Sequence, residues 1–242
     1  MKISHKLVSI IIALAFLVLI QSYSGIFRIV VPVMAIYIGA VGVYNSTYLK
    51  ARKSFTPWSW LRMLIFLAAL TGIYFVLPDG FWRGIFLIAS VGLIYFSEDR
   101  LLAASEQLVF MQALVSFFGL SLVIFALNFY FLPKNTVTLL LILLSAFAVS
   151  RSSFDYIPVE AGKKNFYSLF IAFAVLELAW GLIFLPFYYS ALAIIIFNIF
   201  YVLWIVIYHH LFNNLSRQKI SYHIVFSFIL IVLALVTTPW RV

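Results

Sequence analysis

Glu177 is the residue whose type and position could do chemistry inside a membrane. It lies in the apolar run 170–185, and the ten residues on either side of it carry no other charge. A charge at the centre of a membrane-spanning helix costs about 2.5–3.5 kcal/mol on insertion scales, so such residues face a bundle interior and have a partner. An acid placed in this way can relay protons or cations, or it can hold a cationic group.

Asn198 is the partner that the sequence predicts for Glu177. The two residues lie nearly equidistant from the turn near Phe187 and Tyr188. Antiparallel packing of the helices before and after that turn would therefore place them at one depth, where a protonated Glu177 could donate to the side-chain carbonyl of Asn198. The alternative to a relay is that this polar pair only holds two helices together, with about 0.6 kcal/mol per hydrogen bond.

Cations in two polar connections form the second candidate site. The connections are residues 150–165 and 50–58. Basic side chains beside membrane helices attract anionic headgroups by about 1 kcal/mol each. The sequence therefore predicts phosphate or headgroup contacts from the basic residues of these connections, which are Arg151, Lys163, Lys164, Lys50, Arg52 and Lys53. The alternative is a pair of ordinary solvated connections on the cytoplasmic side.

The sequence carries no signature of a common enzyme or metal site. It has no cysteine, which excludes disulfides, thiolate catalysis and Cys-ligated metals. It also lacks the His-Glu-x-x-His and Gly-x-Ser-x-Gly motifs and a phosphate-binding glycine loop. His209, His210 and His223 are close in sequence, but no carboxylate spacing accompanies them. We therefore predict no catalytic residue, no bound metal and no cofactor.

The composition determines which elements must position these residues. Of the 242 residues 66% are apolar and 10% are charged, and a bilayer core needs about 20 apolar residues per helix. Because unpaired backbone groups are costly in lipid, we predict an all-α integral membrane protein, a polytopic bundle of about nine transmembrane helices. The predicted spans are 5–23, 28–48, 59–77, 82–96, 107–132, 136–150, 166–186, 190–209 and 221–238. The fourth is short, and Ser97, Glu98 and Asp99 are expected to begin the helix that follows it.

The distribution of cations predicts the orientation. With the N-terminus inside, twelve of the 16 Lys and Arg residues fall on the cytoplasmic side and four fall outside. This asymmetry predicts a plasma (inner) membrane protein with a cytoplasmic N-terminus and an extracytoplasmic C-terminus. It also explains the formal net charge of +9 without a nucleic-acid partner.

Similar turns recur along the single transmembrane domain, residues 1–242. Leu-Pro pairs end three predicted helices, at Pro78, Pro133 and Pro186. One interpretation is a set of four tandem helical hairpins near 1–53, 54–106, 107–164 and 165–216, followed by a last helix at 217–242. The alternative is that proline and aromatic residues end membrane helices for the same physical reasons everywhere.

These observations favour a nonenzymatic polytopic membrane protein, either a small transporter-like bundle or a membrane subunit of a larger complex. The alternatives are a lipid-modifying enzyme with a cytoplasmic-face site and a membrane assembly factor. The expected partners are the lipid bilayer, anionic lipid headgroups and, in the subunit hypothesis, other membrane subunits. A transporter should show a path to Glu177, whereas an enzyme should bring Arg151, Lys163 or Lys164 together with an acid.

Overall fold

The predicted helical membrane architecture is confirmed. The computed structural model describes residues 5–23, 27–101, 105–131, 134–212 and 216–237. These residues form nine α-helices and no strand, and every helix is long and apolar enough to cross a membrane. The helices are α1 (His5–Tyr23), α2 (Phe27–Ala51), α3 (Pro57–Val76), α4 (Phe81–Asp99), α5 (Glu106–Phe131), α6 (Asn135–Phe154), α7 (Ala161–Leu182), α8 (Tyr189–Leu211) and α9 (Arg217–Thr237).

Two helix ends differ from the prediction in ways that matter for function. Helix α4 continues to Asp99, so Ser97, Glu98 and Asp99 end a helix instead of beginning one. Its 19 residues span about 28 Å at 1.5 Å per residue, enough to cross most of a bilayer core. Helix α6 continues through Arg151 to Phe154, which places this arginine on a helix rather than in a loop. In both cases the helix continues through polar residues because these residues are buried against the adjacent helices.

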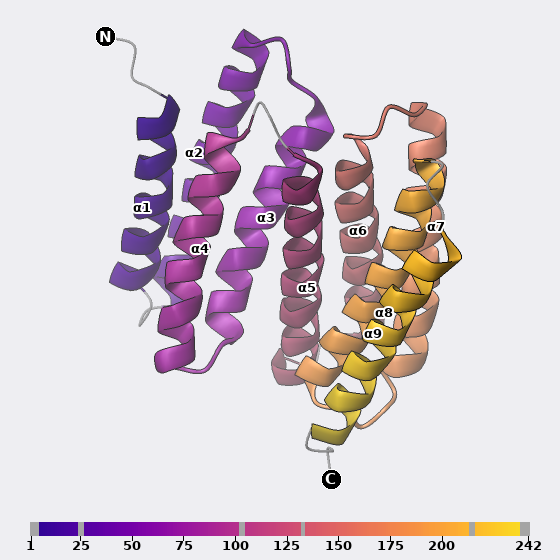
Figure 1. Cartoon of the computed structure of the whole chain (residues 1–242). Helices are drawn as coiled ribbons and strands as arrows, with labels where there is room; N and C mark the ends of the chain where they lie inside the picture. The colour runs from indigo at the N-terminus through magenta and orange to yellow at the C-terminus, as the bar shows by residue number, and fades with distance from the viewer. Residues whose placement is uncertain (1–4, 24–26, 102–104, 132–133, 213–215, 238–242) are drawn as a thin grey trace.

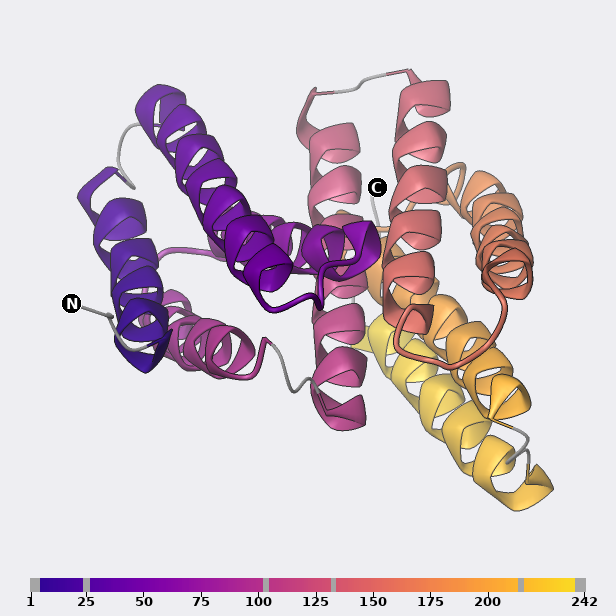
Figure 2. The ribbon, with the colours of Figure 1, turned by 90° about the horizontal axis from the view of Figure 1, so that it is seen from above.

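The helices pack around two apolar cores. One core is built from α1, α2, α3 and α4 and contains Phe16, Met34 and Phe66. The other lies among α3 and α5–α8 and contains Phe117 and Trp204. Figure 2 shows the two groups of helices side by side, with α3 and α5 between them. Helix α9 packs mainly against α8.

The contact between α3 and α5 is the most extensive in the molecule, and it depends on small residues. A Cβ atom at Gly119 would lie 2.9 Å from both the Cβ and the backbone oxygen of Ala69. A Cβ at Gly72 would overlap the side chain of Val123. Small residues at such positions let membrane helices approach closely. The two cores are thus joined along one tightly packed helix pair.

Successive helices run in opposite directions (Figure 1). The end at which α1, α3, α5 and α7 begin, upper in Figure 1, is called the amino-terminal end of the bundle. The even-numbered helices α2, α4 and α6 end there. The two polar clusters described below both lie at this end.

Candidate functional site

Three buried cations surround one carboxylate at the amino-terminal end of the bundle. Arg62 comes from the first turns of α3, Arg151 from the last turn of α6, and Lys164 from the first turn of α7. Their exposed fractions are 7%, 4% and 8%. Asp155 directly follows α6. These four residues are called the basic cluster, and their formal charges leave an excess of two positive charges.

Both carboxylate oxygens of Asp155 already have partners. Oδ1 accepts from Nη1 of Arg151 at 3.5 Å, and Oδ2 accepts from Oγ1 of Thr56 at 2.6 Å. The ammonium of Lys164 donates to the backbone oxygen of Asp155 at 3.2 Å rather than to its carboxylate. Asp155 therefore joins α3, α6 and α7, and its one negative charge is shared among three cations.

The two arginines of the basic cluster differ in how well they are satisfied. Nε of Arg151 donates to Oδ1 of Asn165 at 2.5 Å, and its guanidinium lies 4.6 Å from the centre of the Trp58 ring. Arg62 forms no hydrogen bond with any described residue, and its buried Nε has no partner. Its one favourable electrostatic interaction is with Asp155. A guanidinium presents five donors in a planar fork that suits phosphate or carboxylate, so Arg62 could bind an anion.

The structure brings together two of the six cations predicted to contact phosphate. Arg151 and Lys164 belong to the basic cluster, whereas the other four side chains are exposed, namely Lys163, Lys50, Arg52 and Lys53. Of these, Lys50 lies 5.0 Å from the centre of the Phe55 ring. Arg62 was missed as a site residue because the sequence shows it only as a cation near the start of a span. Its burial depends on packing between helices that are distant in sequence.

The structure does not bring Glu177 and Asn198 together as a hydrogen-bonded pair. Glu177 is exposed on the outer surface of α7, in a shallow depression beside Leu140 and Trp180. Asn198 is buried, but its Nδ2 donates to the backbone oxygen of Ile194 at 2.8 Å and its Oδ1 has no partner. Glu177 thus lies on the surface of the bundle, whereas Asn198 lies in its interior. The face of α7 that packs against the core instead carries Ile171, Val175 and Ala179.

A buried acid that the sequence did not single out lies at the end of α4. Glu98 has no exposed surface, and Nδ2 of Asn45 on α2 donates to its Oε1 at 3.0 Å. Nε2 of His5 on α1 donates to the backbone oxygen of Glu98 at 2.8 Å, and Nδ1 of the same ring lies 3.1 Å from the hydroxyl of Tyr44. These residues, His5, Tyr44, Asn45 and Glu98, are called the acid cluster. Oε2 of Glu98 and Oδ1 of Asn45 have no partner.

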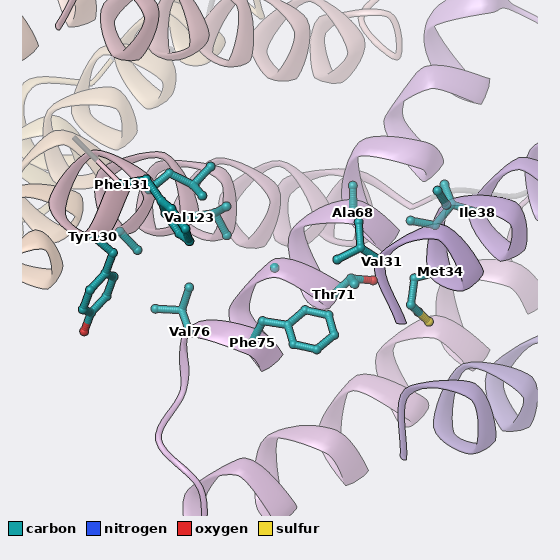
Figure 3. A pocket seen from close by; sticks show the side chains of 14 residues that line it. Val31, Met34, Ile38, Ala68, Thr71, Phe75, Val76, Val123, Tyr130 and Phe131 are labelled. Carbon is teal, nitrogen blue, oxygen red and sulfur yellow. The ribbon is translucent and has the colours of Figure 1, made fainter. Parts of the chain in front are cut away.

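An apolar groove opens between α2, α3 and α5, in the half of the bundle away from both clusters. It has a volume of about 660 Å³ and is lined by residues that include Met34, Phe75 and Val123 (Figure 3). Its two polar side chains are both satisfied. Oγ1 of Thr71 donates to the backbone oxygen of Leu67 at 2.8 Å, and the hydroxyl of Tyr130 lies 3.2 Å from that of Tyr188. The groove thus suits hydrocarbon rather than a polar substrate.

The histidines near the ends of α8 and α9 contact tyrosines. Nε2 of His210 lies 3.0 Å from the hydroxyl of Tyr167, and Nδ1 of His223 lies 2.5 Å from that of Tyr201. Within the described ranges no three His, Asp or Glu side chains gather in a way that could hold a metal ion. Comparison with protein-family models, with curated proteins and with solved structures gives no match to this chain.

Proposed function

We propose that this chain is a nonenzymatic multi-pass protein of the plasma membrane that binds the phosphate group of an anionic lipid. The amino-terminal end of the bundle faces the cytoplasm in this proposal, as the cation distribution predicts. The basic cluster is the binding site. Arg62, Arg151 and Lys164 supply the donors, and the apolar remainder of the lipid lies against the surrounding helices.

The observation that carries this proposal is the buried side chain of Arg62, whose Nε has no hydrogen-bond partner among the described residues. Removing a charge from water costs several kcal/mol unless a counter-charge compensates for it. Asp155 is shared with Arg151 and Thr56. A phosphate group would supply the missing acceptors and the missing negative charge together.

The depth of the cluster fits a lipid headgroup. Arg62 lies five residues beyond Pro57, the first residue of α3, or about 7.5 Å along the helix axis. Arg151 and Lys164 lie within a turn of the helix ends that flank the α6–α7 connection. The N-termini of α3 and α7 also lie at this end, and their helix dipoles favour an anion.

The arrangement favours binding over catalysis. Among the described residues, Asp155 is the carboxylate that pairs with Arg151, and both of its oxygens accept hydrogen bonds. A general base needs a lone pair within reach of the proton that it takes. The hydrogen bonds from Thr56 and Arg151 give Asp155 a structural role between α3 and α6.

The test is retention of anionic lipid by the purified protein in a phosphate-free maltoside detergent. Phosphatidylglycerol is added, and the bound lipid is counted by native mass spectrometry. The wild type should retain lipid, whereas Arg62→Gln and Lys164→Gln should each bind about tenfold more weakly, because each loses a charge-assisted hydrogen bond worth about 1.5–3 kcal/mol.

Lys163→Gln is the matched control, because it removes the same charge from the exposed neighbour of Lys164. It should retain lipid like the wild type. A second arm of the experiment adds inorganic phosphate without lipid. Binding of phosphate alone would identify a soluble ligand instead of a lipid. Equal loss of lipid binding in all three variants would mean that lipid is held by general surface charge, which would contradict the proposal.

A second candidate function, membrane subunit of a larger complex, is favoured by the position of Glu177. This carboxyl lies on the lipid-facing side of α7, in line with the exposed residues Phe173 and Trp180. A polar side chain on such a face is satisfied when another helix packs against it. A second copy of the chain is the simplest partner, because two protonated carboxyls across a twofold axis satisfy each other.

The absence of cysteine gives this second candidate a direct test. Phe173→Cys should form disulfide-linked dimers in the membrane under mild oxidation, and adding Glu177→Leu should abolish them. Ile36→Cys, 72% exposed on α2, is the control for random collision. Equal cross-linking at positions 173 and 36 would exclude self-association through α7.

A further inference from the structure

The acid cluster lacks one hydrogen-bond donor. Oε2 of Glu98 and Oδ1 of Asn45 are both buried acceptors without a partner, although the two side chains are joined by the bond from Nδ2 to Oε1. Buried acceptors without donors are rare because each loses its hydration without compensation. Two of them on one bonded pair of residues indicate that a single missing group satisfies both.

The acid cluster also lacks a cation that could neutralise a carboxylate. Glu98 forms no salt bridge with any described residue. The guanidinium of Arg100, two residues further, lies 4.9 Å from the centre of the Phe96 ring. His5 contacts the backbone oxygen of Glu98 and not its carboxyl group. An ionised Glu98 would therefore be a fully buried charge with one hydrogen bond.

We infer that Glu98 is a proton-binding site and that it is a neutral carboxylic acid in the folded protein at neutral pH. Water supplies the proton, which binds to Oε2, and no other bond forms or breaks. The new hydroxyl donates to Oδ1 of Asn45, while Oε1 continues to accept from Nδ2. Acid and amide then form a pair of reciprocal hydrogen bonds that leaves no acceptor of either side chain without a partner.

Asparagine is a well-matched partner for a neutral carboxylic acid. Its amide offers a donor and an acceptor side by side, which matches the acceptor and donor of a carboxylic acid. A carboxylate accepts only, so its proper partner would be a cation or a second donor. Asn45 and Glu98 both have no exposed surface, so water is not in contact with either side chain.

The elements packed around Glu98 carry other polar or titratable groups, and on α4 the buried hydroxyl of the neighbouring Ser97 also has no partner among the described residues. On α1, His5 uses one ring nitrogen for the Glu98 backbone and the other for Tyr44. On α2, Tyr37 donates to the backbone oxygen of Ile12 at 2.8 Å. On α4 itself, Asp99 and Arg100 follow Glu98 and are at least partly exposed. None of these groups donates to Oε2.

Proton binding by the folded state determines whether stability rises or falls with pH. In the unfolded chain Glu98 is in water and loses its proton above about pH 4, like any glutamate. At neutral pH the folded state therefore binds one proton more than the unfolded state. The folded-to-unfolded ratio should fall by up to about tenfold per pH unit as pH rises, until the folded protein also loses the proton.

Glu98→Gln isolates this effect because glutamine has the shape and hydrogen-bonding pattern of the protonated acid. Unfolding is measured by dodecyl sulfate titration in mixed micelles between about pH 5 and 8. The folded-to-unfolded ratio of Glu98→Gln, divided by that of the wild type, should rise by up to about tenfold per pH unit. Glu160→Gln, at the exposed residue that precedes α7, is the control and should give a flat ratio. In infrared spectra at neutral pH, the carbonyl band of a protonated carboxyl should be present in wild type and absent in Glu98→Gln.

Three results would overturn the inference. A pH-independent ratio for Glu98→Gln would mean that Glu98 is ionised in both states. Failure of Glu98→Gln to fold would show that the negative charge itself is needed. Replacing sodium by potassium is the third arm, and a sodium-dependent stability that Glu98→Gln abolishes would assign the site to a metal cation instead of a proton.

Discussion

Thr56 and Asp155 are joined by a hydrogen bond of 2.6 Å although they lie 99 residues apart in the chain. The same hydroxyl oxygen of Thr56 accepts from the backbone N–H of Ser59 at 3.0 Å and so caps the start of α3. One side chain thus both caps a helix and holds the only carboxylate of the basic cluster. The position of α3 relative to α6 depends directly on this link.

Thr56→Val should destabilise the protein by about 1–3 kcal/mol, because the helix loses its cap and Asp155 loses a donor. The measurement is the unfolding free energy in mixed micelles. Thr47→Val is the control, since the exposed Thr47 bonds only to the backbone of its own helix, at Val43. If both variants lose the same stability, the link between Thr56 and Asp155 contributes nothing.

Trp204→Phe should cost about 1–3 kcal/mol, because a buried hydrogen bond is lost while most of the ring volume is kept. The indole N–H of Trp204 donates to Oγ of Ser153 at 2.7 Å, and the side chain is 1% exposed. Trp82→Phe, at a position 68% exposed, should change stability by less than about 0.5 kcal/mol. The same unfolding titration measures both, and the prediction fails if the two variants do not differ.

Gly119→Ala should destabilise the contact between α3 and α5 by about 1–3 kcal/mol, because the new methyl group overlaps Ala69. Gly92→Ala is the matched control, since a Cβ there meets no atom within 4 Å. That control should be neutral or stabilising by up to about 1 kcal/mol, because alanine is the better helix former. A stabilising Gly119→Ala would show that the two helices can separate without cost.

The orientation can be checked with reporters fused to the chain. Enzymes that are active on only one side of the membrane are attached after Val242 and within the connection between α6 and α7. The asymmetry of Lys and Arg predicts an outside signal for the first fusion and an inside signal for the second. The reverse pair of signals would place the basic cluster on the outer face and contradict a cytoplasmic lipid site.

Hydropathy was sufficient to predict the number, type and approximate bounds of the helices. A membrane requires long apolar helices whatever their neighbours are, so each span can be recognised alone. Hydropathy failed to predict the helix ends where polar residues stay helical because they are buried among other helices. The end of α4 at Glu98 and the end of α6 at Arg151 are both of this kind.

The direction of a side chain around its helix was not predictable from the sequence. Glu177 stands alone in an apolar run and attracted attention, yet it faces outward. Glu98 is followed by Asp99 and Arg100 and was predicted to begin the next helix with ordinary charged residues, yet it is fully buried. Distance from a turn gives depth, but which face meets the core depends on the arrangement of all the helices. The weak amphipathic signal of helices surrounded by lipid does not reveal that face.

The order in which the chain is made differs from the order in which its polar groups find partners. Arg62 leaves the ribosome with α3, whereas Arg151, Asp155 and Lys164 follow only after α4, α5 and nearly all of α6 have been synthesised. During that interval the guanidinium lacks Asp155, and α3 lacks the contact that it makes with α6 in the finished bundle. Assembly of this bundle is therefore completed late, when its central helix is finally covered on both sides.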